Sequence, residues 1–428
     1  MGEAHNKMGL PYHGQMEWSI QPASRIDAVS YEIRGTLAKR ARELEALGHE
    51  ILHLNIGNPG AFGFRTPETM RQAVIRNLQR AEPYGFQMGI FPAREAIAMQ
   101  FQDRGLKETR YDDVVIGNGV SELVDLSLRA LLEPGDEVLI PSPDYPLWSA
   151  SVVLNGGRPV YYPCPPDRDF EPDLEALASA ITPKTRALVV INPNNPTGAV
   201  YSKETLKALA EFAKAHQLIV LADEIYDRIA YDNTDVVPMA TVVDGGVCLT
   251  FGGLSKVYRA CGYRIGWAVL SGATDSAKDY WEAIEKLAAL RLSANMPGQW
   301  AVQTALGGHQ SIAELVAPGG RLHLARQAVM DAVDASNELS LIAPKGALYA
   351  FPTIKAIDQA EREKRPLPFT DQDFAETLLE EKHILVVPGS SFNFQNHAHF
   401  RLTLLPEPDQ LREAVGAMDE VLGQMLGR

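Results

Sequence analysis

The sequence predicts an α/β protein with a mainly parallel sheet in a large domain, followed by a smaller α+β domain. Through the middle of the chain, short apolar runs alternate with amphipathic helical patterns, as in βαβ units. The last third instead combines long helical patterns with short strand candidates. The chain has 428 residues, 46% of them hydrophobic, which is enough to bury more than one core.

The expected strands of the large domain are continuous apolar runs, which are typical of parallel strands covered on both faces. The strands are expected at residues 113–116, 137–140, 186–191, 218–222, 247–251 and 265–270. Between them, helical patterns cover residues 122–132 and 202–216. This alternation of strand and helix predicts the parallel arrangement.

The smaller domain is expected from a change of pattern in the last third. Helical patterns cover residues 279–290 and 320–339, and strand candidates lie at 347–351, 384–387 and 399–405. The polar segment 356–373 is interpreted as a surface loop. We expect the N-terminal residues to pack against this domain, which gives an arm and small-domain part at 1–70, a large domain at 71–310 and a C-terminal small domain at 311–428.

Composition excludes several classes of protein. The net charge of −14 disfavours nucleic acid as a partner, because phosphate contacts need clustered Lys and Arg. No apolar run approaches the roughly 20 residues of a membrane helix. The first 18 residues lack the apolar region of a secretory signal and are expected to form a polar arm. Cys164, Cys248 and Cys261 suggest neither a disulfide framework nor a metal site and favour the cytoplasm.

Polar segments follow three of the expected strands. They are Asn192–Gly198 (NPNNPTG), Asp223–Tyr226 (DEIY) and Gly252–Lys256 (GGLSK). Ligands of open parallel sheets bind at the carboxyl ends of the strands. The three segments therefore predict a binding site at one edge of the sheet.

Each segment also has a simpler interpretation. The first could be only a turn, Asp223 could cap a helix, and Lys256 could be solvated. A carboxylate at a buried strand end, however, needs a cationic partner or a shifted pKa, and a lysine held away from water is a stronger nucleophile. Arg264, eight residues after Lys256, has the fork geometry that suits a phosphate.

Together, NNPTG, ADEIYD, GLSK and an arginine before Gly-Trp resemble the class I and II aminotransferases of pyridoxal 5′-phosphate (PLP) fold type I. The segments LNIGNPGAFGF, NGVSEL, PSPDYPLW and GALYAFP, with the region of Arg401, are similar to the bacterial alanine aminotransferase branch. The resemblance covers nearly the whole chain from about Ser24.

The resemblance implies a seven-stranded sheet, a PLP cofactor and a homodimer with active sites at the subunit interface. It also implies ping-pong transfer of an amino group between an L-amino acid and a 2-oxo acid. The expected amino acid is alanine or a related small aliphatic one, and the expected acceptor is 2-oxoglutarate or pyruvate. Lys256 would carry PLP as a Schiff base and move the substrate proton.

The other matching residues receive roles by the same resemblance. Asp223 would pair with the pyridine nitrogen, Tyr226 and Asn195 would bond the ring oxygen, and Tyr145 would lie against the ring. Arg401 would hold the substrate carboxylate, with Gly57 and Asn195 beside the substrate, although Arg401 could also be a surface cation. The phosphate would be surrounded by Val120, Ser121, Ser255, Arg264 and, from the neighbouring subunit, Tyr84.

Two departures from the family pattern bear on substrate choice. Relatives usually carry Ser-Asp-Ser after the tyrosine at position 84, whereas this chain has Gly85–Met88 in this segment, which is expected to border the active site. Gly252 stands where relatives tend to have asparagine, and its change is expected to affect a hydrogen bond near the phosphate. Four further residues are expected to be structural: Arg291, Cys261, Tyr349 and Phe351.

Other functions remain open from the sequence. The departures allow a specialised aminotransferase of secondary metabolism that acts on an unusual amino acid. A PLP lyase, decarboxylase or racemase would use the same fold. A non-catalytic regulator built on this fold ranks below these enzymes, because the N-terminal region leaves little room for a DNA-binding module.

Overall fold

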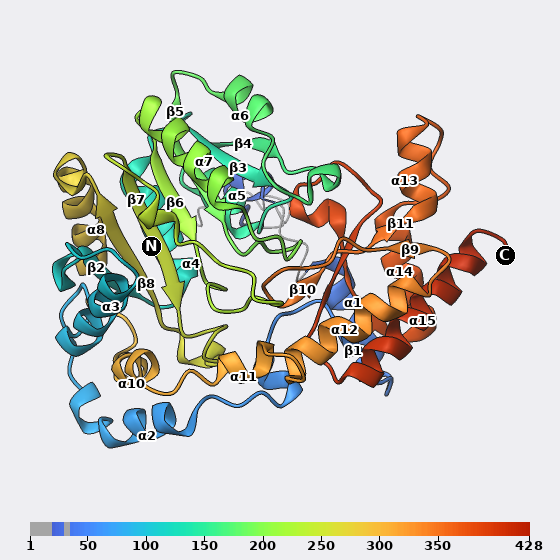
Figure 1. The fold of residues 1–428 in the computed structure, drawn as a ribbon, viewed down its shortest axis with the longest axis horizontal. Helices are drawn as coiled ribbons and strands as arrows, with labels where there is room; N and C mark the ends of the chain where they lie inside the picture. The colour runs from blue at the N-terminus through green and yellow to red at the C-terminus, as the bar shows by residue number, and fades with distance from the viewer. Residues whose placement is uncertain (1–18, 30–34) are drawn as a thin grey trace, which may run out of the picture.

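The computed structural model describes residues 19–29 and 35–428, so the expected polar arm at residues 1–18 lies outside the described residues. Figure 1 shows a large sheet flanked by helices and, beside it, a smaller group of helices and short strands that contains the C-terminus. No helix in the described part of the chain is long and apolar enough to cross a membrane.

The large sheet has seven strands in the order β2-β8-β7-β6-β5-β3-β4. All neighbouring pairs are parallel except those made by β8, which runs antiparallel to both β2 and β7. This confirms the predicted mainly parallel, seven-stranded α/β fold. The strands are β2 (Val114–Gly117), β3 (Glu137–Ser142), β4 (Arg158–Pro163), β5 (Thr185–Ile191), β6 (Ile219–Asp223), β7 (Val247–Gly253) and β8 (Gly266–Gly272).

Helices cover both faces of this sheet because each presents an apolar side to it. On one face, Leu123 and Leu128 of α4 and Ile284 of α8 pack with strand residues such as Val138. On the other face, Leu206 of α7 packs into a separate core. The helices of this part are α2 (Glu68–Arg76), α3 (Phe91–Asp103), α4 (Val120–Leu131), α5 (Leu147–Leu154), α6 (Leu174–Ala180), α7 (Lys203–Ala215), α8 (Lys278–Leu290), α9 (Met296–Gln299) and α10 (Val302–Gly307), and α11 (Ile312–Val316) connects this part to the smaller one.

The smaller part has its own core, which joins segments from both ends of the chain. Leu37 and Leu54 are buried together with Phe374, Leu402 and Val415. Strand β1 also pairs in parallel with β12. The elements are α1 (Thr36–Ala46), β1 (Leu52–His53), α12 (Arg321–Asp334), β9 (Leu339–Ser340), β10 (Tyr349–Ala350), β11 (Thr353–Ile354), α13 (Lys355–Arg362), α14 (Asp371–Lys382), β12 (Ile384–Leu385), β13 (Val387–Pro388), β14 (Phe400–Thr403) and α15 (Pro408–Met425).

The interpretation of residues 356–373 as a surface loop is wrong. Most of α13 and the start of α14 lie in this segment. Only Ile357 and Ala360 of α13 are buried, so the composition of this helix is polar although one side faces the core. Thr370 accepts a hydrogen bond from the backbone N–H of Asp373 and caps α14.

Candidate active site

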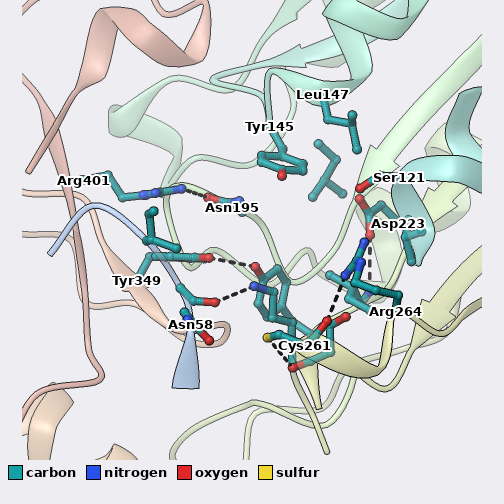
Figure 2. A pocket seen from close by; sticks show the side chains of 18 of the residues that line it. Asn58, Ser121, Tyr145, Leu147, Asn195, Asp223, Cys261, Arg264, Tyr349 and Arg401 are labelled. Carbon is teal, nitrogen blue, oxygen red and sulfur yellow. Dashed lines mark hydrogen bonds between the residues drawn. The ribbon is translucent and has the colours of Figure 1, made fainter. Parts of the chain in front are cut away.

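A cavity of about 720 Å³ lies where strands β5, β6 and β7 end. Every residue assigned to the site from the sequence lines it, except Tyr84. Figure 2 shows Arg401 and Asn195 at one end of the cavity and Asp223, Ser121 and Arg264 at the other. The assigned residues that line the cavity are Gly57, Val120, Ser121, Tyr145, Asn195, Asp223, Tyr226, Ser255, Lys256, Arg264 and Arg401.

Arg401 is a buried cation and not a surface residue. It belongs to β14 and its side chain is 1% exposed. Its Nη1 donates to Asn195 Oδ1 at 2.8 Å, and its Nη2 donates to the backbone carbonyl of Asn55. Its Nε has no hydrogen-bond partner among the described residues. No carboxylate pairs with it within salt-bridge distance in the described chain, so its charge is available to an anion in the cavity.

Asp223 forms the end of β6 and is buried at the cavity wall. Trp148 Nε1 donates to its Oδ2 at 3.1 Å, and the backbone N–H of Ile225 lies 3.4 Å from its Oδ1. Burial raises the pKa of Asp223 above its ordinary value. No helix begins at this residue, so the helix-cap interpretation is wrong. A buried carboxylate with so few donors suits a cationic ring nitrogen.

Lys256 follows β7 and reaches into the same cavity. Its Nζ donates to the backbone carbonyl of Gly57 at 2.6 Å. Gly57 lies in the segment after β1, which belongs to the core of the smaller part. The amine is therefore placed between the sheet and the small domain.

The N-terminus of α4 opens onto the cavity beside Arg264. Gly119 precedes this helix with φ of 84°, and no side chain caps the first turn. This positive φ favours glycine, and a Cβ at Gly119 would also press on the Arg264 guanidinium, 3.0 Å from its Cζ. Free N–H groups of a helix N-terminus and a guanidinium together form an anion site, and Ser121 adds a hydroxyl.

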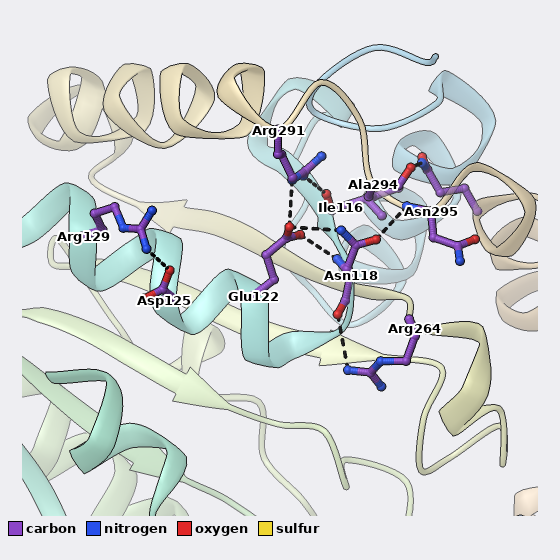
Figure 3. Close-up of polar contacts among 10 residues, drawn as sticks. Ile116, Asn118, Glu122, Asp125, Arg129, Arg264, Arg291, Ala294 and Asn295 are labelled. Carbon is purple, nitrogen blue, oxygen red and sulfur yellow. Dashed lines mark hydrogen bonds and ion pairs between the residues drawn. The ribbon is translucent and has the colours of Figure 1, made fainter. Parts of the chain in front are cut away.

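Arg264 is held from its own side of the cavity. Its Nη1 donates to the carbonyl of Cys261 at 3.0 Å, and its Nη2 donates to that of Asn118 at 3.3 Å. Asn118 in turn donates through its backbone N–H and its amide to Glu122 (Figure 3). Arg291 pairs with the same Glu122 at 3.2 Å and donates to the carbonyl of Ile116. Arg291 therefore has a structural role, as expected, because it holds Glu122 and the end of β2.

Sequence reasoning missed Tyr349 and Cys261 as cavity residues. Both line the cavity, although each was expected to be structural. Tyr349 Oη lies 3.0 Å from Tyr226 Oη. The alternation of β10 correctly placed the ring inside, but burial in a core and at a cavity wall give the same pattern. The one available signal was its place in the GALYAFP segment.

The two departures from the family pattern, Gly85–Met88 and Gly252, do not line the cavity of the single chain. Tyr84 is 78% exposed, and none of the residues of Gly85–Met88 lines the cavity. Gly252 does not line it either. A Cβ at Gly252 would come within 2.6 Å of Trp267 Nε1, so the indole occupies the space of a side chain there. Gly252 therefore lies behind the cavity wall, and its expected effect on a hydrogen bond near the phosphate stays a prediction.

The residues present fit PLP in three respects. An uncapped helix N-terminus with Arg264 suits a phosphate, and buried Asp223 suits a protonated pyridine nitrogen. Lys256 supplies an amine within the same cavity. An α/β sheet with these three groups at the ends of its strands defines the PLP-dependent enzymes of fold type I.

Comparison with known proteins identifies the family. The model of the aminotransferases of class I and II matches residues 49–418, and the chain belongs to this family. The glutamate-pyruvate aminotransferase AlaA of Escherichia coli K12 is 46% identical over 392 residues, which are 92% of this chain and 95% of that protein. An alanine aminotransferase of Mycobacterium tuberculosis H37Rv is 45% identical over 421 residues, 97% of this chain and 96% of that protein.

A solved structure agrees with this assignment. The crystal structure of an aminotransferase from Escherichia coli superimposes with a TM-score of 0.91 at 44% identity, covering 95% of this chain and 99% of that one. The chain is a PLP-dependent aminotransferase of fold type I. When bound, PLP supplies the electron sink that makes the α-proton of an amino acid removable.

Proposed function

We propose that this aminotransferase exchanges an amino group between alanine and 2-oxoglutarate, and in the reverse direction between glutamate and pyruvate. The observation that carries the proposal is that buried Arg401, which has no carboxylate partner among the described residues, lies in the same cavity as Lys256. Arg401 binds the α-carboxylate of the substrate, which orients its α-carbon toward Lys256. The names of the two curated relatives, at 46% and 45% identity, support the choice of substrates.

The remaining walls support a small, neutral amino acid as one substrate. In the described chain, the basic side chains that line the cavity are Lys256, Arg264 and Arg401, and each has a role in the proposal. The cavity walls that carry no charge include Ile56, Leu147, Ile191, Tyr145 and Tyr349. The methyl side chain of alanine needs no polar partner, so it can pack against these uncharged walls.

We further propose the following division of work among the chain's own groups. Lys256 would accept and release the α-proton at its Nζ. Asp223 would keep the ring nitrogen of PLP protonated, and Tyr226 and Asn195 would donate to the ring oxygen. Tyr145 would pack against the ring. Val120, Ser121, Ser255 and Arg264 would hold the phosphate, while Gly57 would border the substrate.

The assembly is also a proposal. Tyr84 is exposed in the single chain, which is compatible with a homodimer in which Tyr84 reaches the phosphate of the neighbouring subunit. The Gly85–Met88 segment would then affect substrate choice across that interface.

We also propose the domain limits 1–70, 71–310 and 311–428, supported by the core that Leu37 shares with the C-terminal helices. Three free cysteines are compatible with the cytoplasm.

A donor and acceptor panel tests the proposal. Alanine, glutamate, aspartate, valine and less common amino acids would be assayed with pyruvate and with 2-oxoglutarate. Alanine with 2-oxoglutarate and glutamate with pyruvate should give the highest kcat/KM values, with the parallel-line kinetics of a ping-pong enzyme. A clear preference for aspartate or for an unusual amino acid would contradict the substrate assignment. Loss of the α-carboxylate without amino transfer would indicate a decarboxylase.

A further inference from the structure

Tyr349 joins three parts of the cavity that come from distant segments of the chain. It lies in β10, next to β14 in the small domain, where its register partner is Thr403. Its hydroxyl meets the hydroxyl of Tyr226, which follows β6 in the large domain, at 3.0 Å. The two rings meet edge to face, with centroids 5.8 Å apart.

The ring of Tyr349 also supports Arg401. The guanidinium Cζ lies 4.3 Å from the centroid of the Tyr349 ring and 4.9 Å from that of Phe392. This contact fixes the plane of a cation whose Nε has no hydrogen-bond partner among the described residues. Figure 2 shows Tyr349 between Arg401 and the group that includes Tyr226.

The hydroxyl of Tyr349 makes its third contact beside Gly57. A Cβ built on Gly57 would overlap Tyr349 Oη and lie 2.8 Å from Tyr349 Cζ. The carbonyl of the same Gly57 accepts the hydrogen bond from Lys256. One side chain thus packs against the segment that receives the amine, the tyrosine near the cofactor ring and the arginine near the substrate.

We propose that Tyr349 is a positioning residue that holds Tyr226 through its hydroxyl and Arg401 through its ring. The inference rests on the roles proposed above for Tyr226 and Arg401. It assigns two separable effects to two parts of one side chain. The hydroxyl positions Tyr226, which would donate to the ring oxygen of the cofactor. The ring positions Arg401, which would bind the substrate carboxylate.

Two substitutions separate these effects in the holoenzyme. Tyr349→Phe removes the hydroxyl and keeps the ring, whereas Tyr349→Leu removes both. The first readout is the pH titration of the absorbance band of bound PLP, without substrate. The second is the Kd of propionate, a carboxylate that has no amino group to transfer. Steady-state kcat and KM for the amino donor form the third readout.

For Tyr349→Phe we expect a displaced titration midpoint and a kcat lower by about 3- to 10-fold, the worth of one neutral hydrogen bond. The Kd of propionate should stay within about 2-fold, because the ring under Arg401 remains. Tyr349→Leu should in addition weaken propionate binding and raise KM by about 5- to 30-fold. In a Tyr226→Phe background, Tyr349→Phe should not move the midpoint further.

Tyr162→Leu is the matched control. Tyr162 is a buried tyrosine of β4 whose hydroxyl donates to the carbonyl of Val189, and it does not line the cavity. Its loss should lower the melting temperature without changing the titration midpoint or the Kd of propionate. The inference is overturned if Tyr349→Phe leaves the midpoint unchanged, if it weakens propionate as much as Tyr349→Leu does, or if Tyr162→Leu reproduces the same pattern. The titration and the propionate measurement need no turnover, so a wrong substrate assignment would fail the donor panel and leave them intact.

Discussion

Asp144 makes the stability of the folded chain depend on pH. The residue precedes Tyr145, is fully buried and accepts a hydrogen bond from Asn393 Nδ2 at 2.9 Å. Its other oxygen, Oδ2, has no partner among the described residues. Burial raises the pKa of this carboxyl from 3.8 to about 7. The ionised form therefore costs about 4 kcal/mol in the folded chain relative to the unfolded one.

Between pH 4 and pH 7 the folded chain binds the proton of Asp144 and the unfolded chain releases it. Stability from this group therefore falls as the pH rises through that window and changes little above pH 7. From pH 5.5 to pH 8 the loss amounts to about 2 kcal/mol. Asp144→Asn keeps an oxygen for Asn393 and cannot ionise, so it should lack this component.

Urea unfolding of the parent and of Asp144→Asn at both pH values measures the effect. The difference between the two proteins at each pH removes the contribution of other groups, including buried Glu224. The variant should gain about 2 kcal/mol relative to the parent on going from pH 5.5 to pH 8. Asp125→Asn, at a half-buried position of α4, is the matched control for the Asp→Asn change itself. A difference between parent and Asp144→Asn that does not vary with pH would refute the reasoning.

Two other substitutions test the cavity. Asp223→Ala removes the carboxylate assigned to the ring nitrogen and should lower kcat/KM by about 100- to 1,000-fold, with weaker PLP binding by fluorescence. Unchanged turnover would refute that role. Gly57→Ala places a Cβ against Tyr349 and should lower kcat/KM by about 10-fold, with partial recovery in Gly57→Ala/Tyr349→Phe. Full activity of Gly57→Ala would show that Tyr349 moves aside without loss of function.

The large sheet could be predicted because its central strands are buried on both faces. The runs at 186–191, 218–222 and 247–251 are continuous apolar segments, and β5, β6 and β7 lie at these positions. The helix α13 was missed because its composition is polar, with only Ile357 and Ala360 buried, and the segment was interpreted from its composition.

The ends of the strands also carried most of the candidate site. Asn195, Asp223 and Lys256 follow three neighbouring strands, so topology alone brings them to one edge. The hydrogen bond between Asn195 and Arg401 could not be predicted, because the two residues are 206 positions apart and follow or belong to strands of different sheets. Tyr349 was missed because strand alternation does not separate a core residue from a cavity wall.

The lysine that carries PLP can be located by chemistry. Borohydride reduction of the purified holoenzyme, followed by proteolysis and mass spectrometry, identifies the modified residue. We expect the label on Lys256, which lies in the cavity with Asp223 and Arg401, and loss of both label and turnover in Lys256→Ala. A label on another lysine, or near-normal turnover of Lys256→Ala, would show that Lys256 does not carry the cofactor.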